Sequence, residues 1–595
     1  MPVIISIVIT FIQFYGVIWI DFPYKERVIS ASAIIMLAWI VLFIMWSRKK
    51  TTNVKKRNEI SVIVMEVILS FCIGICFSCF IWGTSSLSLY PINGINEGIQ
   101  HKDNLFHSAV AESFGRSIIP SALVNGEMPF HYHTFSHLLI KIIGGIISVP
   151  VFLVYNYIYP VLFLPLYVFA QIISIKCAKS YFVKNSFLHL TDYIIIGIYN
   201  IGIFRDAFLS DCGIWKSSYI GSESFLIGNT LAYFAFAGIF CYMKRMNKNK
   251  WLDKLILLVY IPIMIFSLSW AKISIGFLFA ASIMYYVVRI HWNNVKAWVT
   301  GAFYGIIFLI CLNLFSGGQE TFGDIRNSFH LFAFMNSCSG TGNFVGHYLI
   351  LFLMGGLFIA FEMGFKRYHK SDILKGKTIW IEEILIISIL GFLPGLIMNI
   401  NGGSAVYFSY AVETISLILL CGNNFIPQLF AQYKKEWKRA VEITLFLWCV
   451  HIGIINVISI TDDLTYSRKI VALNADEGFY RELMILREMM SDEPEAYTFY
   501  LESNVKAGQV FQSPLASIYV YPGLTGAGVI NASYCDDGKY FMYDGTEIQG
   551  YGLDDVDTGR LSYSEALEKA SEMGKKYVIH VFGNGYEIDE LNKEK

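Results

Sequence analysis

The fold class is decided by residues 254–290, which read KLILLVYIPIMIFSLSWAKISIGFLFAASIMYYVVRI. Two apolar runs flank Trp270-Ala271-Lys272, and each approaches the roughly 20 apolar residues that a helix needs to cross a bilayer. We interpret the stretch as a tight pair of transmembrane helices. The short break leaves the number of crossings at this point open.

The composition of the whole chain indicates a polytopic membrane protein. Of the 595 residues, 55% are apolar and only 15% are charged, and the mean hydropathy is +0.51. Soluble domains are usually about 25% charged. This balance excludes a nucleic-acid binder, a secreted disulfide scaffold and a simple cytosolic enzyme.

The hydropathy pattern predicts a polytopic α-helical membrane protein with about 13 transmembrane helices. Two of them lie in residues 1–59, and a larger transmembrane module follows over 60–460. The predicted spans are 3–20, 28–47, 60–82, 151–175, 191–205, 225–243, 254–270, 272–290, 298–315, 345–362, 379–398, 405–422 and 440–458. No small-residue cleavage site follows the first span, so we expect it to be retained.

Loop charge predicts the orientation of these spans. Residues 461–595 carry 12 Lys and Arg against 24 Asp and Glu, so residues 1–460 carry a net charge of +12. Of the 34 basic residues in that body, 25 fall in one alternating set of loops, which we assign to the cytoplasm. The N-terminus is then cytoplasmic, the C-terminal region is extracytoplasmic, and the expected location is the inner or plasma membrane.

Two long segments fall on the predicted outer side. The first outer loop, 83–150, contains amphipathic stretches at about 104–119 and 133–149, which we expect to be helices lying along the membrane interface. The tail 461–595 mixes helical runs at 479–490 and 564–575 with β-like runs at 517–521 and 577–582. We therefore predict an extracytoplasmic C-terminal α/β domain.

The first outer loop also holds the strongest candidate for catalysis. Asp103 and His107 are four residues apart, so a helix that begins here presents both on one face. The structural alternative, that Asp103 only caps the helix, explains the same residue without catalysis.

Three histidines follow at 131, 133 and 137 in the run HYHTFSH. His133 and His137 have the i, i+4 spacing that places two metal ligands on one helix face. The alternative is a belt of aromatic and imidazole rings at the membrane surface. No cofactor is firmly implied, and binding of a divalent cation stays open.

Charged residues elsewhere on the predicted outer side are candidates for phosphate binding. Lys272 lies between two apolar helices, where an unpaired ammonium is costly, so we expect it to face a polar cavity. Arg205 and Asp211 lie after the fifth span, and Arg326 lies near Gly317-Gly318. Cations of this kind bind phosphate through charge-assisted hydrogen bonds. Snorkelling at the interface is the alternative for each one.

An acidic residue that follows a span and opens a long outer loop resembles the GT-C superfamily of integral membrane glycosyltransferases. At motif level the resemblance rests on Asp103-Asn104-Leu105-Phe106-His107 and on Phe130-His131-Tyr132-His133, which look like stretches of bacterial multispanning proteins placed near this superfamily. The architecture matches over about residues 60–460. The chain departs from the family because Asp103 belongs to no Asp-x-Asp or Glu-x-Asp motif.

The resemblance implies transfer of a sugar from a polyprenyl-phosphate donor to an extracytoplasmic acceptor glycan, lipid or protein, with inversion at the sugar carbon. It gives Asp103 the role of general base and His107 that of orienting Asp103 or contacting phosphate. Lys272, Arg205 or Arg326 would stabilise the leaving phosphate, and His133, His137 and Asp211 are further candidates for substrate binding. The implied partners are membrane lipid and proteins of cell-envelope glycan assembly.

Three other interpretations fit parts of the sequence. A glycan polymerase or ligase would use the same loop with a polymeric donor. A transporter or flippase would explain the many spans and Lys272, but the chain shows no paired halves with interrupted helices. A non-enzymatic assembly or sensor protein would depend on the acidic tail alone.

Overall fold

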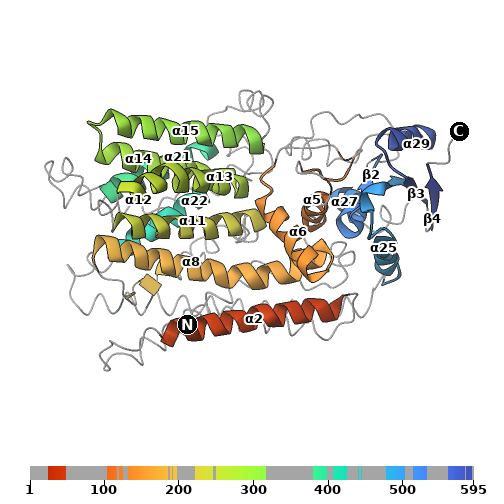
Figure 1. The fold of residues 1–595 in the computed structure, drawn as a ribbon, viewed down its shortest axis with the longest axis horizontal. Coiled ribbons are helices and arrows are strands. Elements are labelled where there is room, and N and C mark those ends of the chain that lie inside the picture. Colours follow the sequence, from red (N-terminus) through yellow and green to blue (C-terminus); the bar gives the residue numbers. More distant parts are fainter. Residues whose placement is uncertain are drawn as a thin grey trace. The chain divides into compact units, whose positions relative to one another are not determined.

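A computed structural model provides the structure of the protein (Figure 1). It describes residues 24–48, 103–114, 116, 120–124, 127, 132–184, 188–189, 192–193, 195–196, 222–244, 250–316, 379–397, 406–424, 440, 444, 477–502, 514–531, 561–582 and 585–591. The chain divides into two compact units. Unit 1 comprises 1–10, 38–81 and 162–458, and unit 2 comprises 11–37, 82–161 and 459–595.

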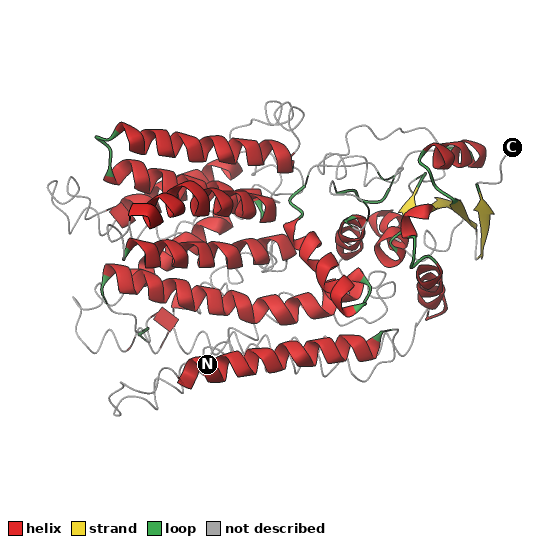
Figure 2. Cartoon of the chain, viewed as in Figure 1, coloured by secondary structure: helices red, strands yellow, loops and turns green. Residues whose placement is uncertain are grey.

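Helices, the red ribbons of Figure 2, are the only regular secondary structure among the described residues of unit 1. Its helices run as α8 (Tyr159–Phe182), α11 (Glu223–Met243), α12 (Lys250–Leu255), η4 (Ile256–Tyr260), α13 (Ile261–Ala271), α14 (Ile273–Ile290), α15 (Val295–Ser316), α21 (Ile379–Ile397) and α22 (Val406–Gly422). The first residues of α8 belong to unit 2, as does the first half of α2 (Lys25–Arg48). Alternating α-helical and π-helical turns make 251–271 one continuous apolar element.

Five helices of the described part are long and apolar enough to cross a membrane, and each overlaps a predicted span, although the one predicted at 151–175 begins ten residues later, at Val161. They are Val161–Phe182, Glu223–Met243, Trp251–Ala271, Ile273–Ile290 and Val295–Phe315. Helices also cover the predicted spans 28–47, 379–398 and 405–422. The predicted spans 3–20, 60–82 and 345–362, and nearly all of 191–205 and 440–458, lie outside the described residues.

The break at Lys272 separates two helices, which answers the question that the sequence left open. Lys272 has extended backbone angles, φ −161° and ψ 119°, between the end of α13 and the start of α14. The two helices pack against each other and α15 packs on both. Large apolar side chains of α13 and α15, including Ile263 at 52% and Ile306 at 56% exposure, face outward, as a lipid environment requires.

Unit 2 contains two helices of residues 83–150, the predicted first outer loop: α5 (Asp103–Ser113) and α6 (Phe135–Ile147). They are followed by α7 (Val151–Leu153) and the π-helical turn η2 (Val154–Ile158). α5 is shorter than the predicted 104–119. The Ser113 hydroxyl donates to the Val110 carbonyl and accepts the Ser121 amide, so the chain folds back at this point. α6 and the 151–158 segment meet at a bend of 111°, and the pair has the length and apolarity of a broken span or a re-entrant loop.

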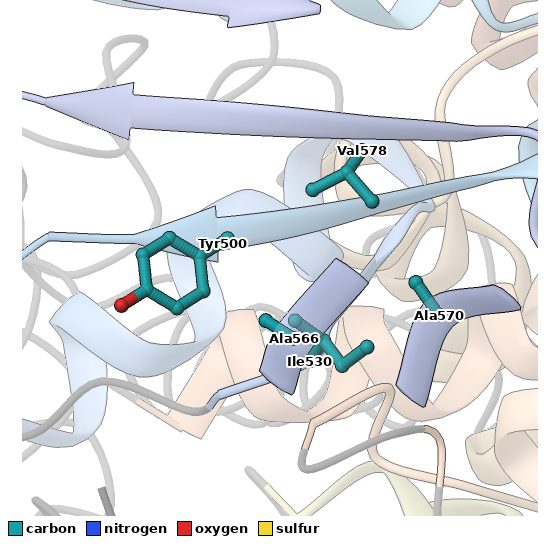
Figure 3. Close-up of a cluster of buried hydrophobic side chains, with 5 residues drawn as sticks. All are labelled: Tyr500, Ile530, Ala566, Ala570 and Val578. Atoms are coloured by element: carbon teal, nitrogen blue, oxygen red, sulfur yellow. The ribbon is translucent and has the colours of Figure 1, made fainter. Parts of the chain in front are cut away.

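The C-terminal part of unit 2 holds a four-stranded sheet in the order β2-β1-β3-β4. The strands are β1 (Tyr497–Leu501), β2 (Gly528–Val529), β3 (Tyr577–Phe582) and β4 (Gly585–Glu590). β1 pairs in parallel with both β2 and β3, and β4 pairs antiparallel to β3. Helix α29 (Tyr563–Glu572) begins with a capping box between Ser562 and Glu565. Figure 3 shows the buried cluster that α29 forms with the sheet, made of Tyr500, Ile530, Ala566, Ala570 and Val578.

The predicted strand at 517–521 is wrong, whereas the strand at 577–582 and the helices near 479–490 and 564–575 are confirmed. Residues 517–521 belong to α27 (Pro514–Thr525), which packs on α5 and on α25 (Glu477–Met489). The side chains of Tyr519 and Val520 are completely buried there. A short apolar run fits a buried helix as well as a buried strand, and packing on α5 decides between them.

Candidate functional site

Helix α5 carries the pair of residues that the sequence marked for catalysis. The helix begins at Asp103, so His107 follows one turn later on the same face, as the spacing predicted. The Asp103 side chain lies outside the described residues. Most of α5 is buried, with Leu105, Phe106 and Val110 each at most 1% exposed. This packing fixes the orientation of the helix, and with it that of His107, within unit 2.

The imidazole of His107 meets that of His137, the third residue of α6. Nδ1 of His107 lies 2.9 Å from Nε2 of His137, and the hydroxyl of Ser136 lies 3.3 Å from the other ring nitrogen of His137. One of the two facing nitrogens must donate a proton to this contact and the other must accept. His137 is fully buried, so the pair is a fixed polar feature of the interior of unit 2.

The predicted pairing of His133 with His137 does not have the geometry that the prediction assumed. α6 begins at Phe135, so His133 precedes the helix and the two residues are not one helical turn apart. His133 packs instead beside the ring of Tyr132, with centroids 3.9 Å apart. The i, i+4 rule failed because it holds only inside a helix.

The π-helical turn η2 supplies two contacts to α5 that sequence reasoning missed. The ring of Tyr155 stacks on His107 with centroids 5.8 Å apart and an angle of 15° between the rings. The amide of Asn104 donates to Oδ1 of Asn156 at 2.9 Å, and the Asn156 amide donates to the Phe152 carbonyl. π-helical turns often occur at functional sites, but no feature of the local sequence predicts this one.

A buried ion cluster lies about one turn beyond the histidines on both helices. Glu112 of α5 forms ion pairs with Lys141 of α6 and with Arg487 of α25, the latter at 2.7 Å between Oε1 and Nη1. The Glu112 carboxyl is buried, and burial alone would raise its pKa. The charges of Arg487 and Lys141 outweigh burial and lower that pKa to about 2. Glu112 is therefore ionised at neutral pH.

In unit 1, Lys272 is buried close to a hydroxyl and an aromatic ring, and the polar cavity expected for it stays a prediction. Its side chain is 7% exposed, and Nζ lies 3.4 Å from the Ser224 hydroxyl and 4.1 Å from the centre of the Tyr407 ring. A hydroxyl and an aromatic face both stabilise a desolvated ammonium. The other candidates, Arg205 and Arg326 for phosphate binding and Asp211 for substrate binding, lie outside the described residues.

The histidine pair has two chemical capacities. Two imidazoles in contact can move a proton between them, and they can hold a nearby carboxylate in one orientation. They can also serve as two ligands of one metal ion, because ligand nitrogens on a tetrahedral zinc are about 3.3 Å apart and the observed spacing is 2.9 Å. Metal binding would replace the hydrogen bond between the two rings.

No protein-family model matches the chain, and no curated protein matches it. Among solved structures it is similar to the oligosaccharyltransferase of Archaeoglobus fulgidus tethered to an acceptor peptide, with 12% identity over 87% of this chain and 69% of that chain and a TM-score of 0.42. The oligosaccharyltransferase AglB from Archaeoglobus fulgidus, in complex with an inhibitory peptide and a dolichol-phosphate, has 13% identity over 88% of this chain and 70% of that chain. Its TM-score is 0.35. A third structure, of the Archaeoglobus fulgidus oligosaccharyltransferase in complex with zinc and sulfate, has a TM-score of 0.33.

Proposed function

We propose that the protein is a membrane glycosyltransferase that transfers a glycan from a polyprenyl-phosphate-linked donor to an extracytoplasmic acceptor. The observation that carries the proposal is the start of α5 at Asp103, with His107 one turn later in contact with His137. A carboxylate at the first turn of an outer-loop helix, followed by a fixed imidazole pair, suits activation of an acceptor hydroxyl or amide. The apolar helices of the chain supply the membrane setting that a lipid-linked donor needs.

The proposed reaction is a single displacement at the anomeric carbon of the donor sugar. The Asp103 carboxylate takes the proton of the acceptor group as that group attacks the anomeric carbon. The bond from that carbon to the phosphate oxygen breaks, and polyprenyl phosphate leaves with the bonding electrons. One displacement inverts the configuration at the sugar carbon.

The other candidate residues take supporting roles in this proposal. His107 and His137 orient the carboxylate or hold a divalent cation, and His133 lies close to them in sequence. Lys272 is assigned to the leaving phosphate, because a buried ammonium stabilises the charge that develops there. Arg205, Arg326 and Asp211 stay candidates from sequence alone. The C-terminal residues 461–595 are proposed to lie outside the cytoplasm and help bind the acceptor.

The test uses purified protein in lipid, offered a panel of polyprenyl-phosphate sugars and glycans, with released polyprenyl phosphate as the readout. Wild type is compared with Asp103→Asn and with the control Asp492→Asn, which changes an exposed carboxyl of the C-terminal region. We expect release by wild type and by the control, and a fall of at least about 100-fold in Asp103→Asn. Equal release by all three proteins would remove the base assignment. Release by none from any donor would favour transport or assembly.

A further inference from the structure

The ion cluster of Glu112 joins the first outer loop to the C-terminal part of unit 2. Glu112 follows His107 by five residues on α5, and Lys141 follows His137 by four residues on α6. Arg487 arrives from α25, more than 300 residues later in the chain. The ion cluster therefore joins the two helices that carry the histidines, at positions about one helical turn from each imidazole.

Arg487 has a second contact that ties the cluster to α27. Its Nη1 donates to the Leu524 carbonyl at 2.9 Å, while the same nitrogen lies 2.7 Å from Oε1 of Glu112. α27 itself packs closely on α5, with the Phe106 and Tyr519 rings edge to face at 5.2 Å. The guanidinium therefore fixes α5 relative to both α25 and α27.

A second ion cluster repeats this connection at another place in unit 2. Glu127, which follows α5 in the chain, pairs with Arg116 and with Lys575, whose Nζ lies 2.7 Å from Oε1. Lys575 is only 4% exposed and also donates to the Glu495 carbonyl at 3.0 Å. Two carboxylates of residues 83–150, the buried Glu112 and the partly exposed Glu127, are thus each paired with a cation of the C-terminal residues.

We propose that Arg487 is a positioning residue for the His107–His137 pair. The C-terminal residues would then help to set the geometry of the candidate site on α5 and α6. The activity consequence rests on the proposed glycosyl transfer, whereas the structural consequence does not. Without the guanidinium, Glu112 keeps Lys141 alone as its cation, and α5 loses its anchor on α25. In the intact protein Nδ1 of His107 lies 2.9 Å from Nε2 of His137. Without the guanidinium this distance is no longer fixed.

An arginine is suited to this position by its shape and charge. The guanidinium stays charged when buried, and its rigid plane holds Nη1 between the Glu112 carboxylate and the Leu524 carbonyl. A lysine retains the attraction to Glu112, but its ammonium ends a flexible stem and is not held in that place. Arg487→Lys should therefore recover part of the function that Arg487→Gln loses.

The test measures two quantities in Arg487→Gln and Arg487→Lys: the kinetics of transfer, and hydrogen exchange of the α5 amides, 103–113. The matched control is Lys576→Gln, because Lys576 pairs with Glu493 on the surface, where both side chains are at least half exposed. We expect kcat to fall about 10- to 100-fold in Arg487→Gln with KM for the donor within about twofold of wild type. We also expect faster exchange across α5, partial recovery with lysine, and wild-type behaviour in the control.

If Arg487→Gln does not fold, the double variant Glu112→Gln/Arg487→Gln removes the stranded carboxylate and should fold, yet still show the low kcat and fast α5 exchange. Wild-type exchange over 103–113 in a folded Arg487→Gln would overturn the positioning role. A wild-type protein that transfers no glycan, together with variants whose α5 exchanges faster, would overturn the proposed function and leave the positioning role supported.

Discussion

Gly523 is the point at which α27 comes closest to α5. A Cβ placed there would lie 2.6 Å from the Leu105 carbonyl oxygen and 3.3 Å from the Leu105 carbonyl carbon and Cα. All three are backbone atoms, so no side-chain rotation relieves the contact. An ordinary Cβ contact begins at about 3.4 Å, so Gly523→Ala would push the helices apart by about 0.8 Å.

The expected cost follows from this displacement. Overpacking of a well-packed interior destabilises by about 1–3 kcal/mol, so Gly523→Ala should unfold at lower temperature and lower denaturant concentration than wild type. The same shift would move α5, which carries Asp103 and His107. Because misplacement by about 1 Å can cost about 100-fold in rate, we expect a large loss of transfer activity in protein that is still folded.

The matched control is Gly145→Ala on α6, where an added Cβ has no atom within 4 Å. Alanine favours a helix interior over glycine, so this variant should gain about 0.5–1 kcal/mol and retain activity. Thermal unfolding and the release assay on all three proteins give the comparison. Wild-type stability and activity in Gly523→Ala would refute the close packing of α27 on α5 as the feature that sets the position of the site.

Two further predictions concern charged residues. Glu112 has a pKa of about 2 in the folded chain against an ordinary 4.5, so its stabilising contribution of about 3 kcal/mol is complete above about pH 4.5 and is lost as the pH falls toward 2. Urea unfolding between about pH 3 and pH 7 should show this loss in wild type and much less of it in Glu112→Gln; equal slopes would contradict the ion cluster. Lys272→Met should fold, because it replaces a buried ammonium by an apolar side chain, but should raise KM for a polyprenyl-phosphate donor about tenfold or more, with Lys272→Arg closer to wild type. An unchanged KM would remove Lys272 from donor binding.

The transmembrane helices could be predicted from the sequence because one physical constraint sets them. The bilayer fixes the length of an apolar run, so 254–270 and 272–290 were predicted within three residues of the observed 251–271 and 273–290. The same reasoning predicts a polar partner for Lys272, because a charge among apolar helices requires one, and the Ser224 hydroxyl lies 3.4 Å from its Nζ. Helix α5 and its residue pair at 103 and 107 were predictable from local spacing alone.

The rest of the candidate site depends on contacts that the local sequence does not encode. That His107 meets His137 follows from the packing of α5 on α6, which the distant Arg487 and Gly523 help to set. The π-helical turn that presents Tyr155 and Asn156 has no sequence signature that we recognised. The strand prediction at 517–521 failed for a related reason: a buried helix and a buried strand have the same short apolar pattern, and only α5 as a neighbour distinguishes them.

The contact of Gly523 with Leu105 also has a consequence for the synthesis of the chain. About 420 residues separate the two positions, which a ribosome adds in roughly 20–80 s. During that interval the buried face of α5, with Leu105, Phe106 and Val110, has no α27 to cover it. Residues 103–113 must therefore be made long before the helix that completes their packing exists, so unit 2 cannot close until the apolar helices between its two parts have been synthesised.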